Sequence, residues 1–241
     1  MKILLVANTD WYLYNFRLDL AKRLRSQGDE VVLVSPDGLY VAQLQAAGFR
    51  WLEWAVGRRT MDPWHEIKAL SSLFKLYRRE KPDLVHHFTV KPVLYGSIAA
   101  RMLGVRATVN SITGLGYLFL KEGPSAQVMK GWVKLFYRYA LRRKGTVAIF
   151  ENESDRQYFI DERLIAPERT YLIEGVGVDT EYFTPLPEPE GTPVVVLAGR
   201  LLWDKGVGVL VEAARQLHKR CDVRIALIGQ PDLGNPATVD E

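Results

Sequence analysis

The stretch that decides the fold is residues 174–206, E-G-V-G-V-D-T-E-Y-F-T-P-L-P-E-P-E-G-T-P-V-V-V-L-A-G-R-L-L-W-D-K-G. It begins with a tight glycine turn at 175–179, followed by a Pro/Glu spacer at 185–193 that is typical of a stiff, solvated linker. The short run of β-branched and other apolar residues Val194–Ala198 then predicts a new strand. The stretch therefore indicates the end of one domain, a linker and the beginning of another.

Two cations follow this new strand. Gly199 and Arg200 close it, and Lys205 and Gly206 precede a segment with a helical period. Strand, glycine turn, cation and helix start is the order in which α/β domains build an anion site at the carboxyl end of a strand. We therefore expect Arg200 and Lys205 to bind an anion; the alternative is an ordinary strand-to-helix turn with surface cations.

Upstream of the glycine turn, strand-like and helical patterns alternate regularly. This alternation predicts an α/β fold in which a doubly wound parallel sheet is covered by helices on both of its faces. The strands are expected at 2–7, 30–35, 49–54, 84–87, 107–110, 146–150 and 170–173, and the helices at 16–27, 39–47, 63–80, 93–103, 125–143 and 153–162.

Downstream of the linker the pattern supports a single β-α-β unit, with strands at 194–198 and 223–228 and a helix near 206–219. Such a unit leaves strand edges unpaired and an apolar face exposed, so it needs more sheet. We therefore expect a chain that is cut short.

Composition narrows the functional classes. The 241 residues are 48% hydrophobic and 25% charged, which is typical of a globular protein. A single cysteine, Cys221, fits a reducing compartment, and no Cys/His spacing indicates a metal site. We find no signal peptide and no apolar run of the roughly 20 residues that a membrane span needs, so we expect a cytoplasmic protein.

The net charge of +4 and the pI near 9.1 favour an anionic partner: a nucleotide, a nucleic acid or a membrane surface. No recognition motif supports nucleic acid. The segment 130–144 mixes aromatic residues with cations, as does a helix that lies on an anionic membrane. The favoured alternative is that its aromatic stripe packs on the sheet.

Polar residues follow several predicted strands. The first strand ends in N-T-D-W-Y-L-Y-N, residues 8–15, without the G-x-G-x-x-G pattern that a nicotinamide cofactor would require. A ligand site that includes Asn15 and a packed surface loop are equally open interpretations. Glu151, after the sixth strand, is a weaker candidate for contact with a polar substrate, and Asn152 or Ser154 is expected to cap the following helix.

The fourth strand carries His86 and His87. Neighbours on a strand point to opposite faces, so we expect one to pack and the other to meet a ligand, with two structural histidines as the alternative. Lys91 precedes a helix start, where an anion is favourable. After the fifth strand, Asn110, Thr113 and Gly114 supply the amide, hydroxyl and open backbone that suit a sugar.

The sequence G-V-D at 177–179, the Pro-rich joint and the G-R-L…K-G pattern at 199–206 resemble the domain crossing of retaining glycosyltransferases of family 4. This resemblance covers nearly the whole chain and implies a GT-B fold of two Rossmann-like domains. It implies that Arg200 and Lys205 bind the diphosphate of a nucleotide-sugar donor, with no cofactor and no obligatory metal. The segments at 85–96 and 113–117 are similar to a subgroup acting on lipid-linked sugars in bacterial surface-polysaccharide assembly.

Three departures from the family pattern stand out. The first loop lacks a glycine pair that many members carry, and Asn110 stands where many have a histidine that touches the donor sugar. The family's glutamate pair would lie beyond Glu241. We therefore predict an acceptor-side domain at 1–180, a linker at 181–193 and an incomplete nucleotide-sugar-binding domain at 194–241, inactive by themselves.

The function implied by the resemblance is hexosyl or N-acetylhexosaminyl transfer, with retention, from a nucleotide diphosphate sugar to a hydroxyl of a lipid-linked saccharide. Weak association with the inner face of an anionic membrane is expected as well. Two alternatives stay open: a nucleotide-sugar 2-epimerase of the same fold, and a non-catalytic binding subunit of a split transferase.

Overall fold

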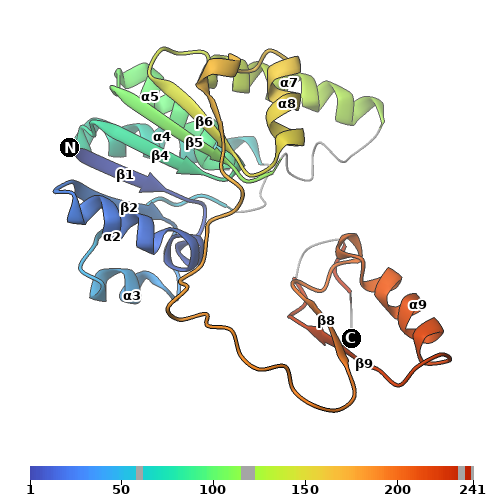
Figure 1. The fold of residues 1–241 in the computed structure, drawn as a ribbon. Coiled ribbons are helices and arrows are strands. Elements are labelled where there is room, and N and C mark those ends of the chain that lie inside the picture. Colours follow the sequence, from blue (N-terminus) through green and yellow to red (C-terminus); the bar gives the residue numbers. More distant parts are fainter. Residues whose placement is uncertain (58–61, 115–122, 233–236, 240–241) are drawn as a thin grey trace. The chain divides into compact units, whose positions relative to one another are not determined.

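The computed structural model describes residues 1–57, 62–114, 123–232 and 237–239. The chain divides into two compact units, Met1–Val178 and Asp179–Glu241, which are described separately (Figure 1).

Unit 1 is built on a parallel sheet of seven strands in the order β3-β2-β1-β4-β5-β6-β7 (Figure 1). The order reverses between β1 and β4, as in a doubly wound Rossmann-like sheet, and polar ligands of such sheets bind near the carboxyl ends of the strands at this point. The predicted α/β fold of GT-B type is confirmed. The strands are β1 (Lys2–Val6), β2 (Glu30–Ser35), β3 (Arg50–Glu53), β4 (Leu84–Phe88), β5 (Ala107–Ile112), β6 (Thr146–Phe150) and β7 (Thr170–Leu172).

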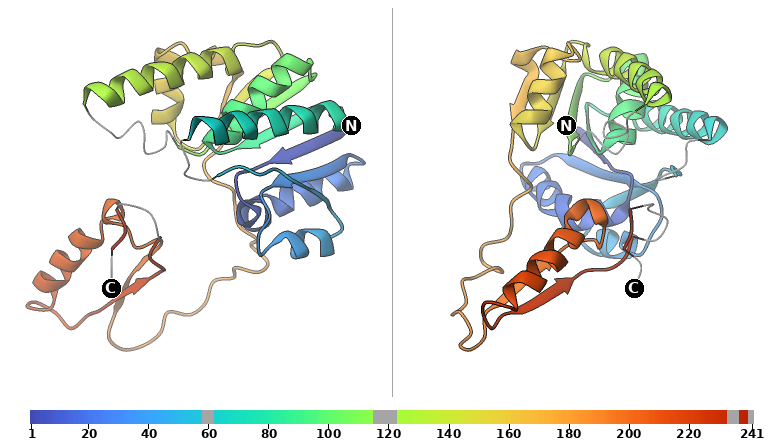
Figure 2. Two further views of the ribbon diagram at one scale, coloured as in Figure 1. Left: turned by 180° about the vertical axis from the view of Figure 1, so that it is seen from behind. Right: turned by 90° about the vertical axis from the view of Figure 1, so that its right-hand side faces the viewer.

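Helices cover the sheet from two sides (Figure 2). On one face, Ile3 and Leu5 of β1 pack with residues of the first helices and α3, such as Leu44; on the other, Leu4 and Val6 pack with α4 and α5. The helices are α1 (Asp10–Tyr12), α2 (Leu18–Ser26), α3 (Val41–Ala46), α4 (Pro63–Glu80), α5 (Ser97–Leu103), α7 (Pro124–Leu141) and α8 (Glu153–Asp161), with a 3₁₀ turn η3 (Pro167–Arg169) before β7.

Two π-helical turns follow the central strands. The turn η1 (Leu13–Arg17) lies after β1 and α1, and the turn η2 (Pro92–Gly96) lies after β4. The expected loop at 8–15 is therefore wrong in part: Thr9 caps a helix whose first residue is Asp10, its hydroxyl accepting from the Tyr12 N–H at 3.2 Å. π-helical turns are rare and are found often at functional sites, because the inserted residue re-aims the side chains around it.

The sheet of unit 1 is not covered on both faces along its whole width, which corrects the sequence-based expectation. On the face opposite α7 and α8, Val147 and Ile149 of β6 are only half-buried, and Tyr171 of β7 is 53% exposed. The chain winds its first helices back toward β2 and β3, so within the described residues no helix lies over this half of the face. The alternation of strands and helices predicted helices over both faces. On the face opposite α7 and α8, helices cover only the half of the sheet near β1.

Unit 2 contains the parallel pair β8 (Val194–Ala198) and β9 (Arg224–Ile228), the 3₁₀ turn η4 (Trp203–Lys205) and the helix α9 (Val207–Leu217). The strands separate so little at their carboxyl ends that a Cβ on Gly229 would lie 1.7 Å from the carbonyl oxygen of Gly199. Val196 and Ile228 are 50% and 57% exposed, so the described part of this unit leaves apolar strand surface in water.

Candidate functional site

A polar cluster lies where β4, β5 and β6 end in unit 1. Its members are Arg17, from the turn η1, His86 of β4, Ser111 of β5 and Glu151, directly after β6. Parallel strands bring their carboxyl ends to one edge, and the register pairs His86 with Val109 and Ser111 with Ile149. The sheet thus assembles residues that are far apart in the sequence.

Arg17 is the centre of this cluster. Its guanidinium carbon lies 4.6 Å from the centroid of the Phe88 ring, and its Nη2 donates to the Tyr12 hydroxyl at 2.5 Å and lies 3.6 Å from Glu151 Oε1. The side chain is only 12% exposed. Its Nε is buried and has no hydrogen-bond partner among the described residues. A largely buried guanidinium held at this edge of the sheet is suited to bind an anionic or hydroxyl-rich ligand.

Glu151 brings the opposite charge to the same edge. Its side chain is 30% exposed, so it can meet solvent or a ligand. Burial raises the pKa of the Glu151 carboxyl, and the nearby Arg17 guanidinium opposes that rise.

His86 is the buried neutral member of the cluster. Its Nε2 lies 2.9 Å from Ser111 Oγ, and its ring packs against Phe88 with centroids 4.1 Å apart. Burial, followed by the charge of Arg17, holds the pKa of His86 well below its ordinary value. At neutral pH it therefore serves as a hydrogen-bonding group and not as a cation.

His87 points to the other face of the sheet, as the alternation along a strand predicts. There it lies between Tyr77 and Asn110, with 2.8 Å from its Nε2 to the tyrosine hydroxyl and 2.8 Å from its Nδ1 to the amide oxygen. The Ser97 hydroxyl donates to the same oxygen at 2.9 Å. A Cβ on Gly96 would lie 2.2 Å from His87 Nε2, so only glycine leaves room for this ring.

This network buries two of the candidate contact residues. His87 and Asn110 are 0% exposed, and the Asn110 Oδ1 accepts from His87 and Ser97, while its Nδ2 is buried without a partner among the described residues. Neither is presented to a ligand in this structure. The open alternative of structural histidines applies to His87, while His86 lies beside Arg17.

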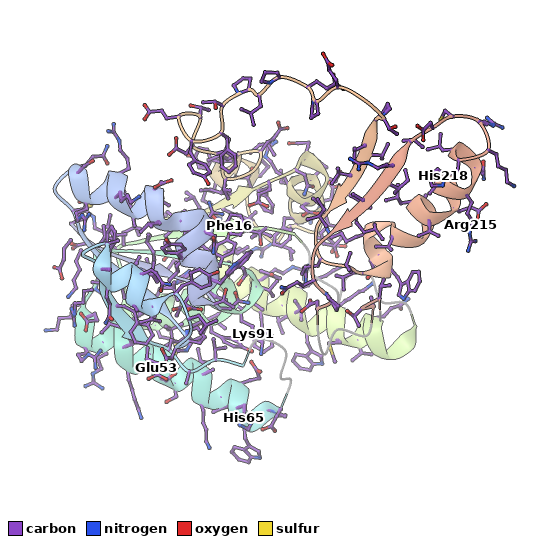
Figure 3. All side chains as sticks on the ribbon, turned by 90° about the horizontal axis from the view of Figure 1, so that it is seen from below. Phe16, Glu53, His65, Lys91, Arg215 and His218 are labelled. Atoms are coloured by element: carbon purple, nitrogen blue, oxygen red, sulfur yellow. The ribbon has the colours of Figure 1, made fainter. Side chains whose placement is uncertain are left out.

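Lys91, which is labelled in Figure 3, contacts other residues of unit 1. Its ammonium donates to the Gly57 carbonyl oxygen at 2.8 Å and to Glu66 Oε1 at 2.6 Å, and the other carboxylate oxygen of Glu66 accepts from Tyr95. An anion at this helix start would have to compete with Glu66. Between β4 and Lys91, Thr89 has a left-handed backbone with φ of 71°, and its Oγ1 is buried without a partner among the described residues.

The other predicted contacts in unit 1 lie outside the polar cluster or at the limit of the described chain. Asn15 is exposed, and its amide donates to the Trp11 carbonyl at 2.9 Å within the helical turn. Thr113 and Gly114 are half-buried at the end of a described range. Residues 115–117 of the same motif lie outside the described residues. Asn152 does cap α8, because its Oδ1 accepts from the Asp155 N–H at 2.8 Å.

In unit 2, Arg200 and Lys205 follow β8 as the sequence predicts. Arg200 is not free for an anion, since its Nη1 donates to Asp232 Oδ2 at 2.7 Å. Lys205 is exposed at the end of η4, and Gly206 turns the chain into α9 with φ of 80°. Asp232 was missed because it follows the other strand of the pair, and nothing local in its sequence marks it as a partner of Arg200.

The helix α7 differs from the favoured sequence interpretation. Tyr137 and Leu141 are buried against the sheet, but Trp132, Leu135 and Phe136 are 60%, 53% and 47% exposed. The aromatic stripe therefore faces solvent over much of its length. Within the described chain, no helix combines the length and the apolar character needed to cross a bilayer.

The sequence of this chain matches a known protein family. Residues 2–152 match the family model described as "Glycosyl transferase 4-like". The chain belongs to this family. The matched range includes every member of the Arg17 cluster and ends just after Glu151.

Two curated relatives resemble the chain beyond this range. One is the N,N'-diacetylbacillosaminyl-diphospho-undecaprenol alpha-1,3-N-acetylgalactosaminyltransferase of Campylobacter jejuni, 23% identical over 96% of this chain and 64% of the relative. The other is the UDP-Gal:alpha-D-GlcNAc-diphosphoundecaprenol alpha-1,3-galactosyltransferase of Escherichia coli, 29% identical over 70% of this chain and 46% of the relative. The chain thus spans less than two thirds of the length of either relative.

Solved structures share the fold at low identity. A glycosyltransferase from Rickettsia africae has a TM-score of 0.69 at 20% identity, over 95% of this chain and 60% of that one. A UDP-GlcNAc 2-epimerase from Methanocaldococcus jannaschii has a TM-score of 0.57 at 12% identity, over 94% and 65%. At this identity the likeness shows the fold alone, which serves both kinds of enzyme.

Proposed function

We propose that this protein transfers a hexosyl or N-acetylhexosaminyl group from a nucleotide diphosphate sugar to a hydroxyl of a lipid-linked saccharide. The observation that carries the proposal is its likeness to two relatives whose names specify sugars on diphospho-undecaprenol as substrates. In the reaction the bond between the anomeric carbon and the donor diphosphate breaks. The acceptor hydroxyl gives its proton to the departing diphosphate, and its oxygen takes the place of the diphosphate on the anomeric carbon with retained configuration.

In this proposal the Arg17 cluster binds the acceptor. A saccharide joined to a diphosphate offers hydroxyl groups and negative charge, and the edge of unit 1 offers a guanidinium and a carboxylate 3.6 Å apart. The carboxylate can accept from sugar hydroxyls while the guanidinium contacts phosphate or hydroxyl oxygens. His86 and Phe88 form the floor that holds Arg17 in place.

Arg200 and Lys205 bind the donor in the same proposal. Negative charge grows on the diphosphate as it leaves, and fixed cations stabilise that charge most effectively when they are already in position. The ion pair with Asp232 holds Arg200 beside the end of β8 before the donor arrives. The diphosphate then either replaces the Asp232 carboxylate as the partner of Arg200 or binds Arg200 together with it.

The exposed stripe of α7 provides a membrane contact suited to a lipid-linked acceptor. Aromatic side chains with polar surroundings partition into the interface of a bilayer, and cations nearby favour anionic lipids. Arg101 of α5 stacks on the Tyr139 ring at 4.2 Å and supplies one such cation at the border of the stripe. We propose weak peripheral association through this face.

Transfer of radiolabel tests the proposed function. A panel of labelled nucleotide sugars is incubated with diphospho-undecaprenol-linked saccharides, and label is measured in the organic phase. The assay uses the 241-residue chain and, where the reading frame continues beyond Glu241, the longer protein. We expect label in the organic phase only with the longer protein, because the described part of unit 2 exposes its strands. Sugar conversion without an acceptor would support the epimerase alternative, and binding of both substrates without turnover would support a binding subunit.

A further inference from the structure

A second charged region lies at the opposite edge of the sheet of unit 1. A cavity of about 410 Å³ is lined by Arg142, Arg163 and Arg169, together with apolar side chains that include Ile160 and Ile165. Arg142 follows α7 shortly before β6 begins, and Arg169 directly precedes β7. The cavity therefore lies near the amino-terminal ends of these strands, whereas the Arg17 cluster lies at the carboxyl-terminal edge.

Backbone carbonyls hold two of the three guanidinium groups in place. Nη2 of Arg142 donates to the Arg163 carbonyl oxygen at 2.9 Å. Nη1 of Arg169 donates to the carbonyl oxygens of Arg143 and Leu141 at 2.7 and 3.3 Å. These contacts fix the arginines without neutralising them, and they leave most of the five N–H donors of each guanidinium for other partners.

The positive charge of the cavity is not balanced by a neighbouring carboxylate. None of the three arginines forms an ion pair with any residue in the described ranges. Glu162, the adjacent acidic residue at the end of α8, is paired with Lys134 at 2.6 Å. Glu168 is exposed in η3 and has no ion pair within the described chain.

Arg163 occupies an unusual backbone position. Its φ is +50°, in the left-handed region where glycine or asparagine normally ends a helix. The Arg163 N–H donates to the Ile160 carbonyl oxygen at 2.8 Å, and Leu164 N–H donates to the Phe159 carbonyl oxygen at 2.9 Å, so the turn is well defined. A long cation at this turn contributes to the lining of the cavity.

We propose that this cavity binds the phosphate group of an organic phosphate. Guanidinium groups recognise phosphate oxygens in pairs, and several held in place lose little freedom on binding. Ile160 and Ile165 give the same cavity an apolar wall, which suits the organic part of the ligand. The phosphate can come from a lipid headgroup or from a soluble phosphate ester. This inference does not depend on the proposed transferase activity.

Methyl NMR of the whole chain provides a readout specific to the cavity. Signals of Ile160 and Ile165 are followed while pyrophosphate, and separately the soluble short-chain lipid dibutyryl phosphatidic acid, is added. We expect saturable shifts with at least one probe, and at least a tenfold weaker affinity in the double variant Arg142→Gln, Arg163→Asn. Asparagine is chosen at 163 because it tolerates the left-handed backbone. The matched control is Lys219→Gln, Arg220→Gln, which removes the same charge at exposed positions of unit 2.

The two probes distinguish the sources of phosphate. The first outcome is pyrophosphate binding that depends on Arg142 and Arg163, while flotation with vesicles containing phosphatidic acid does not depend on them. This outcome assigns a soluble phosphate compound. Flotation that depends on these arginines assigns a lipid headgroup. Absence of shifts at both isoleucines with both probes, or shifts that the double variant retains in full, would overturn the proposal.

Discussion

The guanidinium of Arg17 lies 3.6 Å from the carboxylate of Glu151, measured from Nη2 to Oε1. The π-helical turn after β1 supplies the cation, and the end of β6 supplies the anion. The contact gathers two opposite charges at the edge where the central strands end. In the described part of unit 1, this pair of charges is suited to a ligand that carries both hydroxyl groups and phosphate.

Replacing Arg17 with glutamine is expected to weaken the use of acceptor by about 10- to 100-fold. The reason is the loss of a charge-assisted contact of roughly 1.5–3 kcal/mol. Steady-state kinetics of the longer protein, where the reading frame continues beyond Glu241, measure this as a higher acceptor KM, with donor KM nearly unchanged. Because Arg17 lowers the pKa of Glu151, carboxyl NMR should also show that pKa rising in the variant. The control is Arg23→Gln, at an exposed cation of α2; equal effects in both variants would contradict the assignment.

Replacing Arg200 or Lys205 with alanine is expected to impair donor use. Each change removes a cation from the proposed diphosphate site, at a cost of roughly 1.5–3 kcal/mol. Kinetics of the longer protein, where the reading frame continues beyond Glu241, with varied nucleotide sugar should show lower kcat/KM in both variants. Lys219→Ala, an exposed cation after α9, serves as the control. Unchanged donor kinetics in both site variants would remove these residues from the donor site.

Several elements of the fold could be predicted from the sequence because their signals are local. Proline at its first turn marks the start of α4, and continuous apolar runs mark β6 and β8; all three have the predicted bounds. The π-helical turns could not be predicted, because their apolar spacing reads as ordinary helix. For the same reason Arg17, which falls within the helix expected at 16–27, was not predicted as a site residue.

The candidate site was predictable only in part. Opposite orientations for His86 and His87 follow from strand geometry, but which neighbours enclose each ring depends on α4 and β5. The stripe of α7 shows a further limit. An apolar stripe predicts that a helix face is covered, but it does not identify the surface that covers it. Here Trp132 and Phe136 lie on the part of the helix that the sheet does not reach.

The buried His87 predicts a loss of stability in acid. Burial lowers the pKa of His87 from 6.5 to about 4, so the native state favours the neutral ring. The corresponding stability is fully present above pH 6.5 and is lost as the pH falls toward 4. It amounts to about 3 kcal/mol, at roughly 1.4 kcal/mol per pKa unit.

Denaturant unfolding between pH 7 and 4.5 measures this loss. His87→Gln retains hydrogen-bonding groups and cannot titrate, so its unfolding free energy should depend less on pH than that of the unmodified protein. His86 acts in the same direction, and His86→Gln separates its share. A pH dependence in His87→Gln that equals that of the unmodified protein would show that the ring does not control it.

The exposed face of α7 should mediate binding to anionic vesicles. The double variant Trp132→Ser, Phe136→Ser is expected to bind about tenfold more weakly, because it loses apolar area that enters the interface. High salt should also release the protein, since the screening length falls to about 3 Å at 1 M. Trp203→Ser, at a tryptophan of unit 2 that is 58% exposed, is the control. Equal sedimentation of the unmodified protein, the double variant and the Trp203→Ser control with vesicles would show that this face does not bind the membrane.

Proton NMR of the reaction is the most direct test of whether this protein is a retaining glycosyltransferase. Nucleotide sugar and a water-soluble, diphosphate-linked saccharide acceptor are mixed with the protein, extended beyond Glu241 where the reading frame continues, and the anomeric signals are followed. We predict loss of the donor's anomeric signal and growth of one new signal for a glycosidic bond of the same anomeric configuration, only when acceptor is present. A new nucleotide-sugar signal without acceptor, or inversion at the anomeric carbon, would contradict it.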